Sequence, residues 1–161
     1  MQGGADRDLR RRCAEELLEI GFDGYAYGGR PVDSRGRLLE TVAYVRELVP
    51  QEFPLFALGI GKPESVVRCA EMGYVLFDCV LPTRDGRHGR LYLSTDGFAT
   101  LSADDPAFYQ YLHIQDDRYR RDARPVEDAC DCPACGRYSR AWDAQAFGAP
   151  SIVPEDSWVY L

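Results

Sequence analysis

Segments of helical and strand-like periodicity alternate three times in the first half of the chain. Each time, apolar residues at helical spacing are followed by a short, nearly continuous apolar run that is typical of a buried strand. Helices are predicted over residues 6–21, 34–50 and 62–73, and strands over residues 24–29, 55–61 and 74–82. This alternation with short connections favours a parallel sheet, so the predicted fold class is α/β.

Capping residues predict where each helix begins and ends, and apolar residues at helical spacing predict which face of it is buried. Gly21 follows the first helix, Pro50 ends the second, and Pro63 stands near the first turn of the third, where proline is favoured. The expected buried stripe of the first helix comprises Leu9, Cys13, Leu17 and Leu18. That of the second comprises Leu38, Val42, Val45 and Leu48 or Val49.

Glycines end the first two predicted strands, at Gly28 and Gly29 and then at Gly59 and Gly61. In βα folds ligands bind at the carboxyl ends of the strands, and glycines there let the loops approach a ligand. The pair at Gly59 and Gly61 lacks the third glycine of a dinucleotide fingerprint, so by itself it is a weak phosphate-binding motif.

Asp78 interrupts the third predicted strand, which is otherwise apolar and expected to be buried. An ionised, unpaired carboxylate in such a place costs several kcal/mol. Asp78 is either a strand-end aspartate that caps the next loop, or a nucleophile or acid held where the strand meets a ligand.

A cationic loop is predicted over residues 83–90, directly after this strand. It carries three arginines, a histidine and two glycines against one acid, Asp85. The loop is either a solvated turn or a phosphate-binding loop, since the fork of an arginine matches phosphate oxygens.

Three cysteines form a C-x-C-x-x-C cluster at Cys130, Cys132 and Cys135. Without an export signal, such a cluster suggests a metal rather than disulfides. A tetrahedral zinc site needs a fourth ligand, but the only histidines, His88 and His113, lie upstream. The scattered cysteines, Cys13, Cys69 and Cys79, are expected to be small core residues.

Charge and composition limit the class of protein. The net charge of −7 and the sequence pI of about 4.8 argue against a generally basic nucleic-acid-binding protein. No apolar run approaches the roughly 20 residues of a membrane helix, and the opening MQGGADRDLRRR lacks the core of a secretion signal. A cytoplasmic protein without a membrane partner is expected.

The segments MQGG, IGFDGYAYGG, LGIGKPES, FDCVLPTRDGRHGRLY and CDCPACGRYSRA occur in an order that closely resembles the tRNA-guanine transglycosylases, the queuine or archaeosine tRNA-ribosyltransferase family. The resemblance runs from Gln2 to about Ala141. Family members exchange a guanine in tRNA for a 7-deazaguanine without cutting the backbone. The resemblance implies the C-terminal portion of a TIM (β/α)8 barrel over residues 1–90, a zinc-binding insertion over residues 91–141, and a divergent tail over residues 142–161.

By this resemblance Asp78 is the catalytic nucleophile, which forms a covalent ester with the ribose. The residues that match the base pocket are Gln2, Gly28, Gly29, Leu58 and Gly59, and those that match RNA-contacting segments are Gly59, Lys62, Thr83, Arg84 and Arg87. Cys130, Cys132 and Cys135 would supply three zinc ligands, with no fourth in this chain. The implied partners are tRNA and a 7-deazaguanine base.

The sequence also departs from the family. The N-terminal half of the barrel, with two aspartates that handle the base and the proton, has no counterpart, and Met1 stands where the family usually has valine. After Ala141, WDAQAFGAPSIVPEDSWVYL replaces the usual helix and zinc-binding histidine. We therefore expect an enzyme that acts only with a separate N-terminal half chain or a homo- or heterodimer partner. The alternative is a non-catalytic truncated homologue or an RNA-binding subunit.

Overall fold

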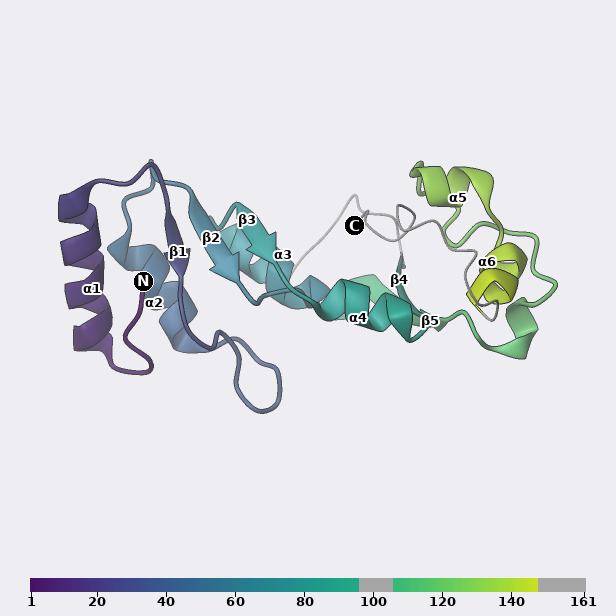
Figure 1. The fold of residues 1–161 in the computed structure, drawn as a ribbon, viewed down its shortest axis with the longest axis horizontal. Coiled ribbons are helices and arrows are strands. Elements are labelled where there is room, and N and C mark those ends of the chain that lie inside the picture. Colours follow the sequence, from purple (N-terminus) through teal and green to yellow (C-terminus); the bar gives the residue numbers. More distant parts are fainter. Residues whose placement is uncertain (96–105, 148–161) are drawn as a thin grey trace. The chain divides into compact units, whose positions relative to one another are not determined.

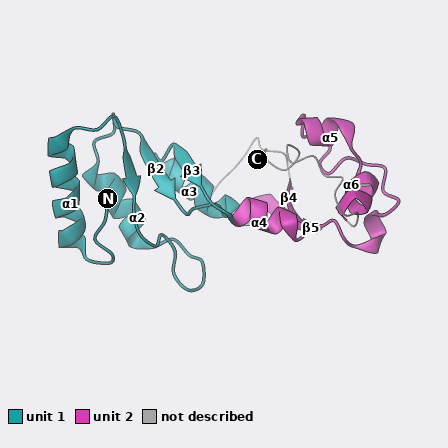
Figure 2. Ribbon diagram, in the orientation of Figure 1, with its two compact units in different colours: residues 1–80 teal, residues 81–161 magenta. Residues whose placement is uncertain are grey.

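The computed structural model describes residues 1–95 and 106–147. The chain divides into two compact units, residues 1–80 (unit 1) and residues 81–161 (unit 2), as Figure 2 shows. The division falls at Val80, before the end of the barrel portion that the sequence places at residue 90. Part of the predicted insertion and residues 148–161 of the predicted tail lie outside the described residues.

Unit 1 alternates helices and strands as predicted (Figure 1). In chain order the elements are α1 (Arg7–Ile20), β1 (Tyr25–Tyr27), α2 (Glu40–Leu48), β2 (Leu55–Leu58), α3 (Pro63–Met72) and β3 (Leu76–Asp78). The strands form one parallel sheet in the order β1-β2-β3, with Tyr27 opposite Ala57 and Leu58 opposite Asp78. The prediction of a parallel α/β arrangement is confirmed.

The limits of α1 and α3 follow the cap residues that the sequence offers. The side chain of Asp6 accepts hydrogen bonds from the first free N–H groups of α1, and Gly21 ends the helix in the left-handed region, at φ 79°. Pro63 occupies the first turn of α3, and Gly73 ends that helix at φ 100°.

The helix predicted from residue 34 begins only at Glu40, so this prediction was wrong at its start. The carboxylate of Asp33 accepts hydrogen bonds from the backbone N–H groups of Arg35 and Arg37, at 2.8 and 2.9 Å. Gly36 has φ 78°, a conformation that a helix interior does not allow. Hydrogen bonds of a local turn therefore satisfy the backbone N–H groups of residues that the apolar spacing assigned to a helix.

The core of unit 1 lies between the sheet and its helices. Its buried residues include Tyr27, Val42, Val45, Leu55, Ala57, Ile60, Cys69 and Tyr74. The expected stripe of α1 was partly wrong: Leu9 is 55% exposed, Leu17 and Leu18 are half-buried, and Arg10 and Ala14 are buried instead. Cys69 is buried as predicted, whereas Cys13 and Cys79 are half-buried.

The third strand was expected to be buried, and the structure contradicts this. Val75 and Leu76 are 59% and 56% exposed, and Asp78 is exposed as well. The reason is topological: β3 lies at the edge of the described sheet and pairs only with β2. Asp78 thus avoids the cost of a buried carboxylate.

A further stretch of backbone follows the other edge of the sheet. The amino group of Met1 donates to the carbonyl of Ala26 at 2.6 Å, and the N–H of Gly28 donates to the carbonyl of Met1 at 2.8 Å. Hydrogen bonds to both neighbours of Tyr27 are the pattern of a parallel ladder. Gln2 is therefore held beside the carboxyl end of β1.

Unit 2 contains α4 (Leu81–Arg87), an antiparallel pair of β4 (Arg90–Ser94) and β5 (Tyr109–His113), and α5 (Pro133–Arg137) and α6 (Arg140–Phe147). Two 3-10 turns lie at Pro106–Phe108 and Asp117–Tyr119. Leu93, Leu112 and Ile114 form its small core. No helix in residues 1–95 and 106–147 is both long and apolar enough to span a membrane.

The cationic loop predicted over residues 83–90 is wrong for most of its length, because residues 81–87 form α4. Pro82 stands in the first turn, where its missing N–H costs nothing. Gly89, at φ 68°, makes the turn into β4. The glycines and charges of this short segment suggested a loop. The contacts of Asp85 with β4, described below, stabilise the segment as a helix.

Candidate functional site

Most of the predicted base-binding and catalytic residues of unit 1 lie at the carboxyl ends of its strands. Gly28 and Gly29 follow β1, Leu58 ends β2, and Gly59 comes directly after it. Asp78 is the last residue of β3. Because the strands are parallel, these residues gather at one edge of the sheet.

Asp78 is fixed by the backbone of the neighbouring strand end. The N–H of Gly59 donates to the carbonyl oxygen of Asp78 at 2.9 Å and to its Oδ1 at 3.3 Å. Gly59 has φ 77°, which a residue with a Cβ adopts only with strain. Within the described residues Oδ2 has no hydrogen-bond partner, so an exposed carboxylate is oriented through one oxygen and available through the other.

Gln2 lies against the glycine pair that follows β1. A Cβ added to Gly28 would lie 2.5 Å from Nε2 of Gln2, and one added to Gly29 would lie 3.8 Å from its Oε1. Any larger residue at position 28 would displace the amide. Three residues that the resemblance assigns to one base pocket therefore lie next to one another.

Lys62, the predicted RNA-binding cation of unit 1, directly precedes α3. Its Nζ lies 3.8 Å from Oε1 of Glu64, and a Cβ on Gly36 would come within 3.1 Å of it. The ammonium group therefore reaches the turn of residues 33–37.

The other predicted RNA-binding residues, Thr83, Arg84 and Arg87, are exposed on α4 in unit 2. No carboxylate among the described residues forms an ion pair with Arg84 or Arg87. Free guanidinium groups on one short helix can bind phosphate oxygens. The predicted RNA-binding set is therefore distributed over both units.

Asp85 is a residue of α4 that sequence reasoning treated only as a counter-charge. It is 4% exposed, accepts a hydrogen bond from the hydroxyl of Tyr92, and lies 3.9 Å from NH2 of Arg90. Burial, followed by the contact with Asp85, raises the pKa of Tyr92 well above its ordinary value. Asp85 joins α4 to β4 and so positions the arginines on either side of it. An acid flanked by arginines was the signal that could have pointed to this role.

The three clustered cysteines form a candidate metal centre. The sulfur atoms of Cys130, Cys132 and Cys135 all lie within 4.8 Å of one another, and all three residues are half-buried. Sγ of Cys132 accepts the N–H of Cys135 at the start of α5, which lowers the pKa of the Cys132 thiol. Among the described residues no fourth histidine, cysteine or carboxylate joins the cluster. The donor set fits three positions of a tetrahedral zinc site.

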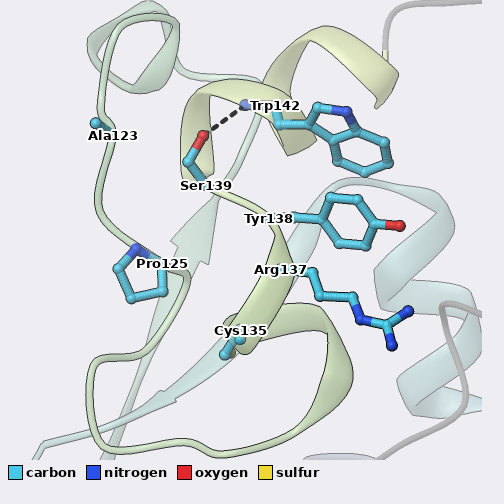
Figure 3. Close-up of a pocket in the computed structure, with 8 residues that line it drawn as sticks. Ala123, Pro125, Cys135, Arg137, Tyr138, Ser139 and Trp142 are labelled. Carbon is cyan, nitrogen blue, oxygen red and sulfur yellow. Dashed lines mark hydrogen bonds between the residues drawn. The ribbon is translucent and has the colours of Figure 1, made fainter.

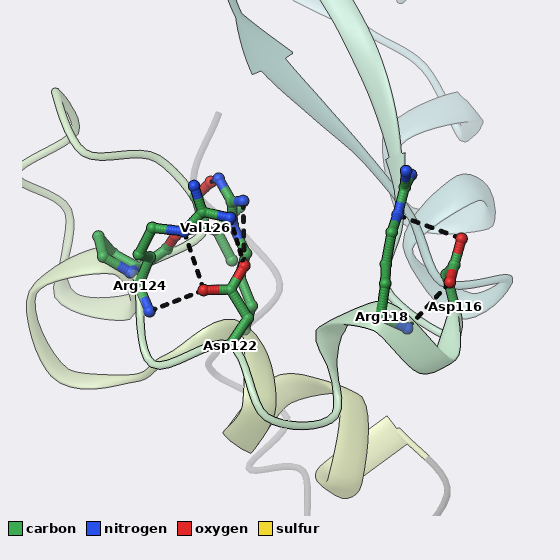
Figure 4. Close-up of polar contacts among 7 residues, drawn as sticks. Asp116, Arg118, Asp122, Arg124 and Val126 are labelled. Carbon is green, nitrogen blue, oxygen red and sulfur yellow. Dashed lines mark hydrogen bonds and ion pairs between the residues drawn. The ribbon is translucent and has the colours of Figure 1, made fainter.

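A network of charged side chains, which includes Asp122 and Arg124, lies in the segment that precedes the cysteines (Figure 4). Arg140, at the start of α6, donates to the carbonyls of Pro125 and Val126 at 2.9 and 2.8 Å, and lies 3.4 Å from Asp122. Asp122 also binds Arg124 at 2.7 Å, and the hydrogen bonds from Arg124 hold the pKa of Asp122 well below its ordinary value. The segment that leads to the cysteines is thus tied to α6.

An open surface pocket of about 360 Å³ lies beside the cysteine loop (Figure 3). Its lining includes Cys135, Arg137, Tyr138, Ser139 and Trp142. The rings of Tyr138 and Trp142 stack at 4.0 Å with 22° between their planes. Sequence reasoning missed this pocket, although the aromatic residues Tyr138 and Trp142, shortly after the cysteines, were a usable signal.

Comparison with known proteins shows which family this chain resembles. A family model described as queuine tRNA-ribosyltransferase matches residues 1–150. The queuine tRNA-ribosyltransferase of Ruegeria pomeroyi is 35% identical over 154 residues, which cover 95% of this chain and 37% of that protein. That of Cereibacter sphaeroides is 37% identical over 154 residues, with the same coverage. That of Methylacidiphilum infernorum is 38% identical over 143 residues, covering 88% and 34%. The chain therefore spans little more than a third of the length of these curated relatives.

Proposed function

The chain belongs to the queuine tRNA-ribosyltransferase family, and on this basis we propose that it carries the nucleophile and part of the base pocket of a tRNA-guanine transglycosylase. The observation that carries the proposal is the position of Asp78. Its exposed carboxylate lies at the same edge of the sheet as the group formed by Gln2, Gly28 and Gly29, and it is oriented by Gly59.

In the proposed reaction an oxygen of Asp78 attacks C1′ of the target ribose. The bond from C1′ to N9 of guanine breaks, its electron pair leaves with the guanine, and a protonated guanine departs. N9 of the incoming 7-deazaguanine then attacks C1′ from the opposite face, loses its proton, and releases Asp78 as a carboxylate. Two displacements retain the configuration at C1′, as in retaining glycosidases.

Gln2 and the backbone at Gly29 would orient the incoming base, while Leu58 and Gly59 line the same edge. Within the described residues, the hydrogen bond that the Asp78 side chain accepts comes from the backbone of Gly59 and not from an acid. We propose that the proton-handling groups come from a part of the enzyme that corresponds to the remaining length of the relatives. The isolated chain is then inactive.

We further propose that unit 1 is an arc of a (β/α)8 barrel. Three parallel strands with intervening helices support this, as does the ladder-like pairing of Met1 with β1. The exposed apolar residues Val75 and Leu76 at the β3 edge are those that a further strand would cover.

Zinc is the proposed cofactor, held by Cys130, Cys132 and Cys135 in a structural role. When bound, the metal supplies cross-links between loop segments rather than reaction chemistry. The fourth ligand must come from outside the described residues. Lys62 in unit 1 and Thr83, Arg84 and Arg87 in unit 2 are the proposed tRNA-binding residues, and the target nucleotide leaves its stack to reach Asp78.

Asp78→Asn tests the catalytic proposal. The chain, supplied with the N-terminal part of a family barrel, should incorporate labelled guanine into tRNA and form a protein–RNA adduct that survives denaturation. Asp78→Asn should abolish both, because an amide is not a nucleophile at C1′. Asp23→Asn is the matched control, since Asp23 is also exposed in unit 1 but lies before β1. Exchange that persists in Asp78→Asn would refute the nucleophile. A complemented wild type that binds tRNA without exchange would favour a non-catalytic RNA-binding subunit.

Neutralising Arg84 and Arg87 together tests the RNA-binding proposal. Because each phosphate contact on single-stranded nucleic acid contributes about 0.7 to the salt slope, Arg84→Gln with Arg87→Gln should reduce that slope by about 1.4. The measurement is tRNA affinity against salt concentration. Arg120→Gln with Arg121→Gln, also exposed in unit 2, serves as the control. An unchanged slope in the first pair would mean that these arginines only solvate α4.

A further inference from the structure

Arg10 is the largest fully buried side chain of unit 1, at 1% exposure. It lies on the inner face of α1, where the apolar pattern predicted leucine. No carboxylate among the described residues pairs with it. A buried guanidinium is costly unless its N–H groups and charge are satisfied, so its surroundings must compensate.

Backbone carbonyls and one ring provide this compensation. Nε of Arg10 donates to the carbonyl of Gly4 at 2.7 Å, and NH1 and NH2 both donate to the carbonyl of Gly28 at 3.4 Å. NH2 also donates to the hydroxyl of Tyr27 at 3.0 Å, and the guanidinium carbon lies 4.5 Å from the centre of the Tyr27 ring. The side chain thus joins two chain segments that are distant in the sequence.

Both segments flank the group of Gln2, Gly28 and Gly29 described above. The first carries Gln2 and turns at Gly3 and Gly4, and the second ends β1. A Cβ on Gly3 would lie 2.7 Å from Cγ and from the backbone nitrogen of Arg10, and one on Gly29 would lie 3.6 Å from NH2. Arg10 therefore packs against Gly3, which follows Gln2, and lies close to Gly29.

We propose that Arg10 is a positioning residue for the base pocket, which rests on the proposed function. Its fork holds the carbonyls of Gly4 and Gly28 at a fixed separation, so that the Gln2 side chain and the Gly29 backbone present their polar groups to the incoming base. The specific requirement is for arginine. A lysine ammonium is a point charge that cannot hold both carbonyls and also bind the hydroxyl of Tyr27.

Arg46 provides a matched control within the same unit. It is 6% exposed and donates to the carbonyls of Val49 at 2.5 Å, Pro50 at 2.8 Å and Gly73 at 3.3 Å. These carbonyls precede β2 and β3, at the amino-terminal edge of the sheet. Both arginines bind buried carbonyls, but only Arg10 does so beside Gln2, Gly28 and Gly29.

The test compares Arg10→Lys with Arg46→Lys in the complemented chain, with kcat and KM for the base measured separately alongside the melting temperature. Both substitutions should lower the melting temperature. Arg10→Lys should raise KM for the base about tenfold, with a smaller change in kcat, because the substitution disturbs orientation of the base and leaves Asp78 in place. Arg46→Lys should leave KM unchanged.

Amide hydrogen exchange supplies a readout that does not depend on turnover. Arg10→Lys should speed exchange at Gly28, whose N–H binds the carbonyl of Met1, and Arg46→Lys should speed it at Gly73 and Tyr74. A wild-type KM in Arg10→Lys, or an equal rise in Arg46→Lys, overturns the inference and leaves the proposed function standing. A complemented wild type that neither exchanges nor binds base overturns both.

Discussion

The two units of the chain bury charge in opposite ways. Unit 1 has an extended apolar core, and its buried charged side chains are the arginines Arg10 and Arg46, whose hydrogen-bond partners are mainly backbone carbonyls. Among its described residues, unit 2 has a small core around Leu93, Leu112 and Ile114, and the buried charged side chain there is Asp85, bound by the Tyr92 hydroxyl beside Arg90.

This difference indicates what each unit depends on. Apolar burial and a continuous sheet stabilise unit 1, so we expect the geometry of its site to change little with salt or pH. Unit 2 relies on side-chain charges, such as those of the network of Asp122, Arg124 and Arg140. It also relies on its three clustered cysteines, which form no disulfide. Its geometry is therefore expected to respond to metal, pH and single polar substitutions.

Removal of metal should have the largest effect and should be confined to unit 2. Structural zinc sites contribute apparent binding free energies on the order of 10 kcal/mol, and three thiolates supply a substantial part of that. A chelator, or Cys132→Ser, should speed amide exchange over residues 122–147 and leave residues 1–80 unchanged. A chelator should have no further effect on Cys132→Ser. Protein purified without chelator that contains almost no zinc would contradict the metal site.

Truncation of the apolar core should give the next largest effect, now confined to unit 1. Leu55 is fully buried, so Leu55→Ala should lower the free energy of unfolding by about 2–5 kcal/mol. Leu9→Ala, at a position that is 55% exposed, should change it by no more than about 0.5 kcal/mol. Denaturant unfolding followed by exchange in each unit measures both. Similar losses in the two variants would mean that the apolar core of unit 1 is not its main support.

The same contrast explains how far the sequence could predict the structure. The parallel sheet, the limits of α1 and α3, and the grouping of glycines at strand ends were predictable, because caps and apolar runs are local signals. The burial of Arg10 was not predictable, since its hydrogen-bond partners are mainly backbone carbonyls, which any sequence offers. The exposure of β3 could not be predicted either, because the apolar composition of a strand does not reveal whether it lies at the edge of a sheet.

In unit 2 sequence patterns were less informative. The cysteine cluster was predictable from spacing alone. Helix α4 was not predictable, because its seven residues include a glycine and because the contact that stabilises it joins Asp85 to Tyr92, a residue outside the helix. The Arg140 network likewise depends on carbonyls of a segment that has no regular structure. Tertiary polar contacts of this kind leave no periodicity in a sequence.

Loss of the Tyr92 hydroxyl should have a moderate effect on unit 2. Tyr92→Phe leaves buried Asp85 without its hydrogen bond, which costs about 1–3 kcal/mol. Tyr111→Phe is the matched control, because Tyr111 is on the paired strand and 42% exposed, and it should cost less than about 0.5 kcal/mol. Exchange rates of the α4 and β4 amides measure both. Equal, small effects would show that Asp85 does not hold α4.

The smallest expected effect is a pH dependence of unit 2 that comes from Asp143 on α6. Burial raises the pKa of this half-buried carboxyl from its ordinary value of 3.8 to about 6. Since the folded pKa is the higher one, the stabilising protonated form is fully present below pH 3.8 and is lost as the pH rises through 6. Asp122 acts in the opposite direction: its lowered pKa gives stability that is present above 3.8 and lost on further acidification.

Asp143→Asn separates these two contributions, because the amide cannot ionise and Asp122 remains. Between pH 4 and about 6 the wild-type unit 2 should lose stability relative to Asp143→Asn, so the variant should be the more stable of the two at pH 7 and similar to wild type near pH 4. Thermal melting at several pH values, with exchange in unit 1 as the internal reference, measures the difference. Parallel pH profiles for the two proteins would mean that water reaches the Asp143 carboxyl in the folded state, and that unit 2 then owes its pH response to ion pairs alone.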